Sequence, residues 1–131
     1  MTSSSLVRAE SLGTYCWEQA PFAHIFCFDV EAKGQYFSLT GEDIAKAARY
    51  PIGGTALFDI ANNVYRLEFT QNLGNIEVYE NTAEIDPLTL NGTWTDDGGN
   101  SGEFKHLGMG PLGEDKINEL TNRRAPRKIK R

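Results

Sequence analysis

The stretch from Thr55 to Leu107 reads TALFDI-ANN-VYRLEFT-QNLG-NIEVYE-NTAEIDP-LTLNGTWT-DDGGNS-GEFKHL, and it decides the fold. Five short segments with apolar residues are separated by groups of Asn, Asp, Gly and Pro. Asn, Asp and Gly favour chain reversals because they adopt positive φ or hydrogen-bond to their own backbone. Short strands at this regular spacing predict antiparallel neighbours that form a barrel or a sandwich.

The residues before this stretch extend the predicted sheet. Residues 13–19 alternate between two faces, with Tyr15 and Trp17 on one of them. Residues 22–30 are the most apolar segment, and both of its faces are mainly apolar, which is typical of a central strand. Residues 35–39 follow the next turn and return as its hairpin partner.

A short helix is predicted after the third strand, within residues 40–51. Thr40 can cap its N-terminus, acidic residues follow in its first turn, and Ile44 with two alanines forms a narrow apolar stripe. Pro51 ends the pattern. Because so short a helix is marginal alone, we expect it to cover one end of the sheet.

The length of 131 residues fits one domain with one core. We expect a mainly-β fold, a single antiparallel barrel or sandwich of about seven or eight short strands with that one helix. A flexible leader is expected at residues 1–10, the mainly-β domain at residues 11–122 and a basic tail at residues 123–131. Residues 114–122 could add a weak closing helix.

Charge is distributed unevenly. The net charge is −5, all 18 acidic residues precede residue 123, and six of the 13 basic residues lie at residues 123–131. A basic tail on an acidic domain suggests docking onto a protein partner with an acidic surface. Nucleic acid is a less favoured partner, because the acidic domain would repel phosphates. The expected partner-binding residues are Arg123, Arg124, Arg127, Lys128, Ile129, Lys130 and Arg131.

The N-terminus lacks the features of a secretory signal, and no apolar run is long enough to span a bilayer. We therefore expect a cytoplasmic or organelle-matrix protein. Two cysteines fit a reducing compartment. Cys27 lies between Phe26 and Phe28, where a free thiol acts as a small hydrophobic group. The alternative is a Cys16–Cys27 disulfide between neighbouring antiparallel strands.

Signals for catalysis are weak. The chain has two histidines, His24 and His106, and no recognisable nucleophile motif. We expect His24 to be hydrogen-bonded at the edge of the core and His106 to be exposed. Asp29 and Asp59 lie in apolar strands and could form an acid/base pair with His24. Alternatively, each lies at a strand end and meets water or an arginine. No metal or cofactor is expected, because the Cys and His spacing matches no zinc motif.

A small barrel could also hold an apolar molecule in its lumen. The side chains expected to line that lumen are Phe22, His24, Phe26, Phe28, Asp59, Tyr65, Phe69 and Trp94. Gly92-Thr93-Trp94 resembles the Gly-x-Trp signature of the calycin barrels, which include lipocalin and avidin relatives. In those families the signature lies on the first strand, whereas here it falls on the penultimate predicted strand, so we do not assign the chain to them.

The sequence thus favours a non-catalytic binding or accessory subunit of a larger protein assembly, with an acidic β-domain and a basic C-terminal docking tail. The alternative is a small β-barrel that binds an apolar small molecule in its lumen. A third possibility is association with nucleic acid through the tail.

Overall fold

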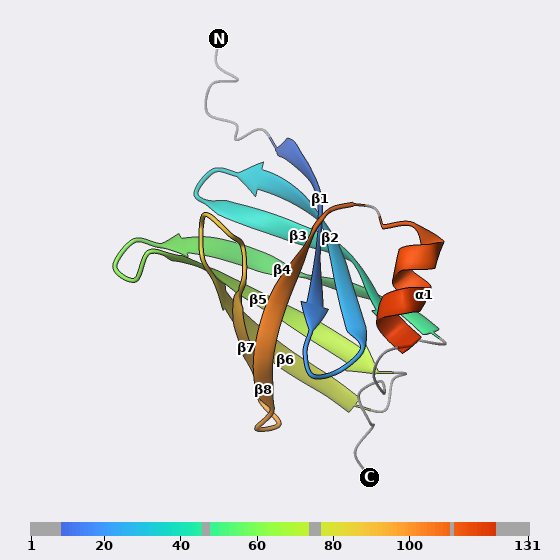
Figure 1. Cartoon of the computed structure of the whole chain (residues 1–131). Coiled ribbons are helices and arrows are strands. Elements are labelled where there is room, and N and C mark those ends of the chain that lie inside the picture. Colours follow the sequence, from blue (N-terminus) through green and yellow to red (C-terminus); the bar gives the residue numbers. More distant parts are fainter. Residues whose placement is uncertain (1–8, 46–47, 74–76, 111, 123–131) are drawn as a thin grey trace.

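The computed structural model describes residues 9–45, 48–73, 77–110 and 112–122. Eight strands of these residues form a closed barrel, in which each strand pairs antiparallel with the next and β8 pairs with β1 (Figure 1). The strands are β1 (Glu10–Gln19), β2 (His24–Lys33), β3 (Tyr36–Ala45), β4 (Ala48–Asp59), β5 (Val64–Leu73), β6 (Glu77–Ile85), β7 (Gly92–Asp96) and β8 (Ser101–Met109). The predicted mainly-β, antiparallel fold is confirmed, and it is a barrel.

Alternation along the strands sorts the side chains between lumen and exterior. In β2 every second residue from His24 to Val30 is buried in the barrel, whereas Asp29 is exposed. In β5 Leu67 and Phe69 are buried and the intervening Glu68 is exposed. This period of two is expected of strands with one face on the core.

The prediction of a helix within residues 40–51 is wrong. Thr40 and Asp43 belong to β3 and pair with both β2 and β4. Asp43 lies in the lumen and Ile44 packs in a cluster on the outer face, so neighbouring residues have opposite environments, as in a strand. Pairing on both sides outweighs the local capping signals, because an isolated helix of this length is marginal.

The described part of the chain contains one helix, α1 (Glu114–Asn122), close to the C-terminus. Its buried Ile117 and Leu120 pack on the outside of the barrel against Ile25 and Ile44 (Figure 1). Glu114 and Asp115 lie in its first turn, where negative charge is favourable. The helix expected at residues 114–122 therefore forms, and it covers one side of the barrel.

Cys16 and Cys27 form a disulfide between β1 and β2, beneath α1. The two residues are direct cross-strand partners with a Cα–Cα distance of 4.1 Å, which suits the close pairs of an antiparallel ladder. The expectation of free thiols is thus wrong, because register places the two sulfur atoms side by side. Disulfides persist mainly in oxidising compartments, and the expected cytoplasmic or matrix location stays a prediction.

Strand boundaries on both sides of the β6–β7 connection also differ from expectation. The sequence predicts strands at residues 75–80 and 88–95, but β6 continues to Ile85 and β7 begins only at Gly92. Asp86 Oδ1 accepts hydrogen bonds from the backbone N–H groups of Leu88 and Thr89, at 2.7 and 3.0 Å, which holds a turn there.

A layer of four phenylalanines fills the middle of the lumen. The aromatic layer consists of Phe26, Phe28, Phe69 and Phe104, all with at most 2% of their surface exposed. The Phe26 and Phe69 rings are 5.0 Å apart at an edge-to-face angle, and those of Phe69 and Phe104 are 5.9 Å apart. An eight-stranded barrel is just wide enough for side chains to fill. The layer therefore separates the two ends of the lumen.

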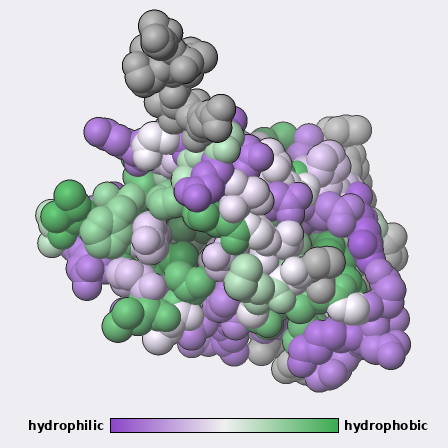
Figure 2. All heavy atoms as spheres, turned by 90° about the horizontal axis from the view of Figure 1, so that it is seen from above, coloured by the Kyte–Doolittle hydropathy of each residue, from purple (hydrophilic) through white to green (hydrophobic). Residues whose placement is uncertain are grey.

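Much of the surface is hydrophilic, but Figure 2 shows a group of hydrophobic side chains at its left edge, where Figure 1 places the β4–β5 turn. Within the described ranges, no helix is long and apolar enough to cross a membrane. The expected leader, apart from its last two residues, and the basic tail at residues 123–131 lie outside the described residues.

Reduction of the disulfide should lower the free energy of unfolding by roughly 2–3 kcal/mol, because the bond closes a loop of 11 residues in the unfolded chain. The measurement is denaturant unfolding with and without a reductant. A Cys16→Ala/Cys27→Ala variant is the control and should not respond to the reductant. Equal midpoints for the wild type in both conditions would contradict the pairing.

Candidate functional site

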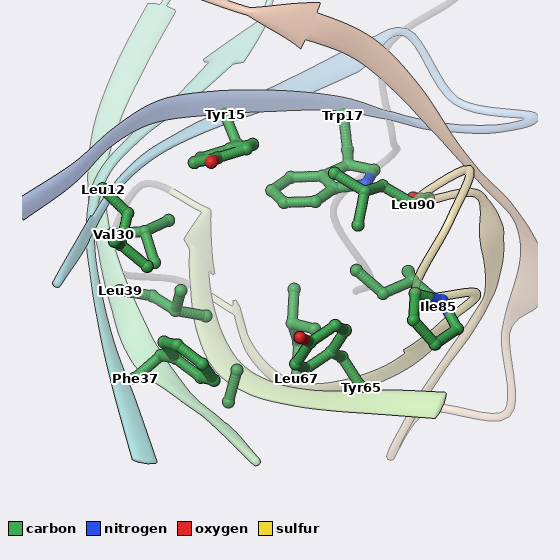
Figure 3. A pocket seen from close by; sticks show the side chains of 12 residues that line it. Leu12, Tyr15, Trp17, Val30, Phe37, Leu39, Tyr65, Leu67, Ile85 and Leu90 are labelled. Carbon is green, nitrogen blue, oxygen red and sulfur yellow. The ribbon is translucent and has the colours of Figure 1, made fainter. Parts of the chain in front are cut away.

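An apolar pocket opens at the end of the barrel where β1 begins and β2 ends (Figure 3). Its volume of about 280 Å³ lies near the lower end of the range for small-molecule sites. We call it the mouth pocket. Its lining residues are Leu12, Tyr15, Trp17, Val30, Phe37, Leu39, Ala56, Tyr65, Leu67, Ile85, Pro87 and Leu90.

The walls of the mouth pocket come from strands that are far apart in sequence. Tyr15 and Trp17 point inward from β1, and Tyr65 and Leu67 face them from β5 across the cavity (Figure 3). In each pair the two residues are separated by one outward position, so the period of a strand places both in the lumen. The pocket exists because closure of the barrel brings β1 opposite β5.

Polar groups in the mouth pocket are few. The Trp17 Nε1–H donates to the carbonyl oxygen of Leu90 at 2.8 Å, which fixes the indole ring and the β6–β7 connection together. The side chains of Tyr15 and Tyr65 carry their phenolic oxygens on opposite walls (Figure 3). A phenol can both donate and accept a hydrogen bond. The pocket thus combines apolar walls with two adaptable polar groups.

His106 lies beside Trp17, as its cross-strand partner in β8. Its ring is 5.4 Å from that of Trp17 and 6.2 Å from that of Tyr15. His106 Nε2 is buried and has no hydrogen-bond partner among the described residues. Burial lowers the pKa of His106 below its ordinary value of 6.5, because the charged imidazolium loses hydration. The expectation that this histidine is exposed is wrong: β8 turns it toward the aromatic wall.

A second group of polar side chains lies at the opposite end of the lumen. The buried polar cluster consists of Gln19, His24, Asp43, Gln71 and Asn81, each with at most 2% of its surface exposed. Gln71 Nε2–H donates to Asp43 Oδ2 at 3.1 Å, and Gln19 Nε2–H donates to Asn81 Oδ1 at 3.1 Å. Hydrogen bonds between side chains of five strands therefore satisfy most of these groups.

His24 and Asp43 form the centre of the buried polar cluster. His24 Nδ1 is 2.6 Å from Asp43 Oδ1, whereas His24 Nε2 has no partner among the described residues. A carboxylate beside an imidazole nitrogen fixes the tautomer and orientation of the ring. The aromatic layer lies between this pair and the mouth pocket, so the pair does not contact a molecule held there.

The eight residues expected to line a ligand site separate into groups. Tyr65 lines the mouth pocket, and His24 belongs to the buried polar cluster. Phe22 packs against Trp94 at a ring distance of 5.9 Å, and Trp94 donates its Nε1–H to the carbonyl oxygen of Ala20 at 2.7 Å. The remaining aromatic residues, Phe26, Phe28 and Phe69, belong to the aromatic layer.

Asp59 lies outside the lumen, at the end of β4. Its carboxylate accepts a hydrogen bond from Asn62 Nδ2 at 2.8 Å and is 2.9 Å from Arg66 Nη2. The hydrogen bonds from Asn62 and the Arg66 guanidinium lower the pKa of Asp59. Asp29 is exposed and accepts from the Thr14 hydroxyl. The structure does not bring Asp29, Asp59 and His24 together as an acid/base group.

Most residues of the mouth pocket were not singled out from the sequence. The alternation of Tyr15 and Trp17 was visible, but nothing local indicated that Leu39, Leu67 and Ile85 would share their cavity. Alternation tells which residues share a face of one strand, whereas the cavity depends on the register of several strands.

Comparison with family models, with curated proteins and with solved structures finds no match for this chain. Within the described residues, no three His, Cys, Asp or Glu side chains gather as metal ligands would. The candidate site therefore rests on the geometry of the mouth pocket.

Lowering the pH through 6.5 should reduce the free energy of unfolding in a way that depends on His106. The unfolded residue takes up a proton near that pH, whereas the folded imidazole takes one only at lower pH. Denaturant unfolding of the wild type and of His106→Gln between about pH 7.5 and pH 5 measures the difference. Identical pH dependence in the two proteins would contradict the assignment.

Replacing Asp43 by Ala should destabilise the fold by about 2–4 kcal/mol, because buried polar atoms of His24 and Gln71 lose their partner. Glu42→Ala is the matched control: its exposed ion pair with Arg49 is expected to contribute less than about 1 kcal/mol. Chemical denaturation compares the two. Equal losses of stability would refute a structural role for the buried polar cluster.

Proposed function

We propose that this barrel binds a small, uncharged and largely apolar molecule in the mouth pocket. The observation that carries the proposal is the pocket itself, a cavity of about 280 Å³ whose walls are apolar side chains from several strands. Concave, mostly apolar cavities with a few placed polar groups are typical of small-molecule sites. Eight-stranded barrels are wide enough to hold one small ligand.

The chemistry of the lining restricts the ligand. None of the described residues that line the pocket carries a charge. A charged group placed among them would lose hydration without a compensating ion pair, at a cost of several kcal/mol. The hydroxyl groups of Tyr15 and Tyr65 favour a ligand with one or two carbonyl, ether or hydroxyl groups. Apolar area removed from water would supply most of the affinity, at about 25 cal/mol per Å².

The docking of the basic tail onto an acidic protein is a separate hypothesis. The residues proposed for it, 123–131, lie outside the described part of the chain. The acidic character of the domain and the basic character of the tail are properties of the sequence, and they support the hypothesis only at that level. Association with nucleic acid through the same residues stays a prediction as well.

Binding of a dye that accepts energy from tryptophan should quench the fluorescence of Trp17 more strongly than that of Trp94. Trp17 lines the mouth pocket, whereas Trp94 is fully buried and hydrogen-bonded to Ala20. We expect the neutral apolar dye N-phenyl-naphthylamine to quench tryptophan emission in Trp94→Phe as in the wild type. The same titration of Trp17→Phe should give weaker quenching, because the remaining Trp94 does not line the pocket. Equal quenching in both variants would place the dye elsewhere.

Filling the pocket should weaken dye binding. Ala56→Leu adds three carbon atoms to the pocket wall, and we expect an affinity at least tenfold lower, a difference of about 1.4 kcal/mol. Thr55→Leu is the matched control, because Thr55 is exposed on the outer face of the same strand. Dye emission measures both affinities. Unchanged affinity in Ala56→Leu with an intact fold would reject the mouth pocket as the binding site.

A further inference from the structure

Exposed apolar side chains surround the opening of the mouth pocket. Ile60, in the β4–β5 turn, has 83% of its surface exposed, and Leu88, in the β6–β7 connection, has 93%. Other members come from strand ends at the same opening. The apolar rim consists of Leu12, Tyr36, Phe58, Ile60, Leu88 and Met109.

The apolar rim is confined to one end of the barrel. Among the large hydrophobic side chains that are exposed in the described residues, Leu57 neighbours the rim on the outer face of β4, and only Val78 lies at the other end. Scattered exposed hydrophobic residues are normal, but a group of them around a cavity marks an interaction surface. Figure 2 shows the part of this group that lies over the β4–β5 turn.

We propose that the apolar rim inserts into the surface of an electrically neutral lipid bilayer. The rim encloses the opening of the mouth pocket, so an apolar molecule could pass between the bilayer and the pocket without crossing water. This delivery step rests on the function proposed above. Binding of the rim to lipid does not, and it can be measured on the protein without a ligand.

The form of the apolar rim favours a lipid surface over a protein partner. Its most exposed members lie on separate turns, and polar residues such as Asn62, Asn63 and Thr89 neighbour them in those turns. Stable protein interfaces need a continuous, closely packed patch. A fluid interface can accept each apolar tip separately, and aromatic residues such as Tyr36 and Phe58 are favoured there.

Charges near the apolar rim decide which lipids it accepts. Among the described residues at this end of the barrel, acidic side chains outnumber basic ones, and Arg66 is already paired with Asp59 and Glu84. The charged residues described there are Glu10, Glu31, Lys33, Asp59, Arg66, Glu84 and Asp86. An acidic end is repelled by anionic lipids and by the same end of a second copy of the chain. Zwitterionic lipid avoids both penalties.

The test is flotation of the full chain with phosphatidylcholine vesicles. We expect the wild type to float with the vesicles and the Ile60→Ser/Leu88→Ser variant to partition at least tenfold less. Val78→Ser removes an exposed apolar side chain at the opposite end and is the matched control, which should float like the wild type. Adding phosphatidylglycerol to the vesicles should weaken binding of the wild type.

Several results would overturn this inference. One is equal flotation of the wild type and the double variant; another is a wild type that does not float at all. Stronger binding to the anionic vesicles would show that charge, not the rim, holds the protein. Sedimentation measurements in which the wild type dimerises through the rim, without binding vesicles, would assign the rim to contacts between copies.

The same variants separate this inference from the proposed function. Ile60 and Leu88 do not line the mouth pocket, so the double variant should bind N-phenyl-naphthylamine in solution as tightly as the wild type. Lost flotation with retained dye binding supports the role of the rim. Normal flotation in a protein that fails to bind the dye would leave the lipid surface in place and reject the ligand.

Discussion

The pairing of β8 with β1 is the constraint on which the other features of this protein depend. It closes eight strands into a ring and thereby fixes the width of the lumen. A lumen of this width is just large enough for inward side chains to fill it. Four phenylalanines fill it at mid-height. They divide the rest of the lumen into two separate ends.

The two ends of the lumen are lined by different kinds of side chain. At one end, hydrogen bonds among Gln19, His24, Asp43, Gln71 and Asn81 close the barrel with polar side chains that satisfy one another. At the other end, apolar side chains leave a cavity that is open to the surroundings. Polar groups specify geometry at the closed end, whereas apolar groups line the end that stays open.

Alternation along the strands made the mainly-β class, the turns and the inward aromatic residues predictable from the sequence. Contacts across the barrel were not predictable, because the His24–Asp43 pair joins residues 19 positions apart and depends on the register of β2 with β3. The error at residues 40–51 has the same origin. Thr40 and Pro51 give helix signals to a local analysis, whereas the strands on either side supply hydrogen bonds that no local window contains.

The position of α1 has a consequence for the chemistry of the cysteines. Cys16 has no exposed surface, and Ile117 and Leu120 of α1 belong to the apolar cluster around it. Thiol–disulfide exchange requires a thiolate to approach one of the two sulfur atoms directly. Cys27 is only partly buried, so exchange is directed to its side of the bond, and direct attack on the Cys16 sulfur requires α1 to detach from the barrel.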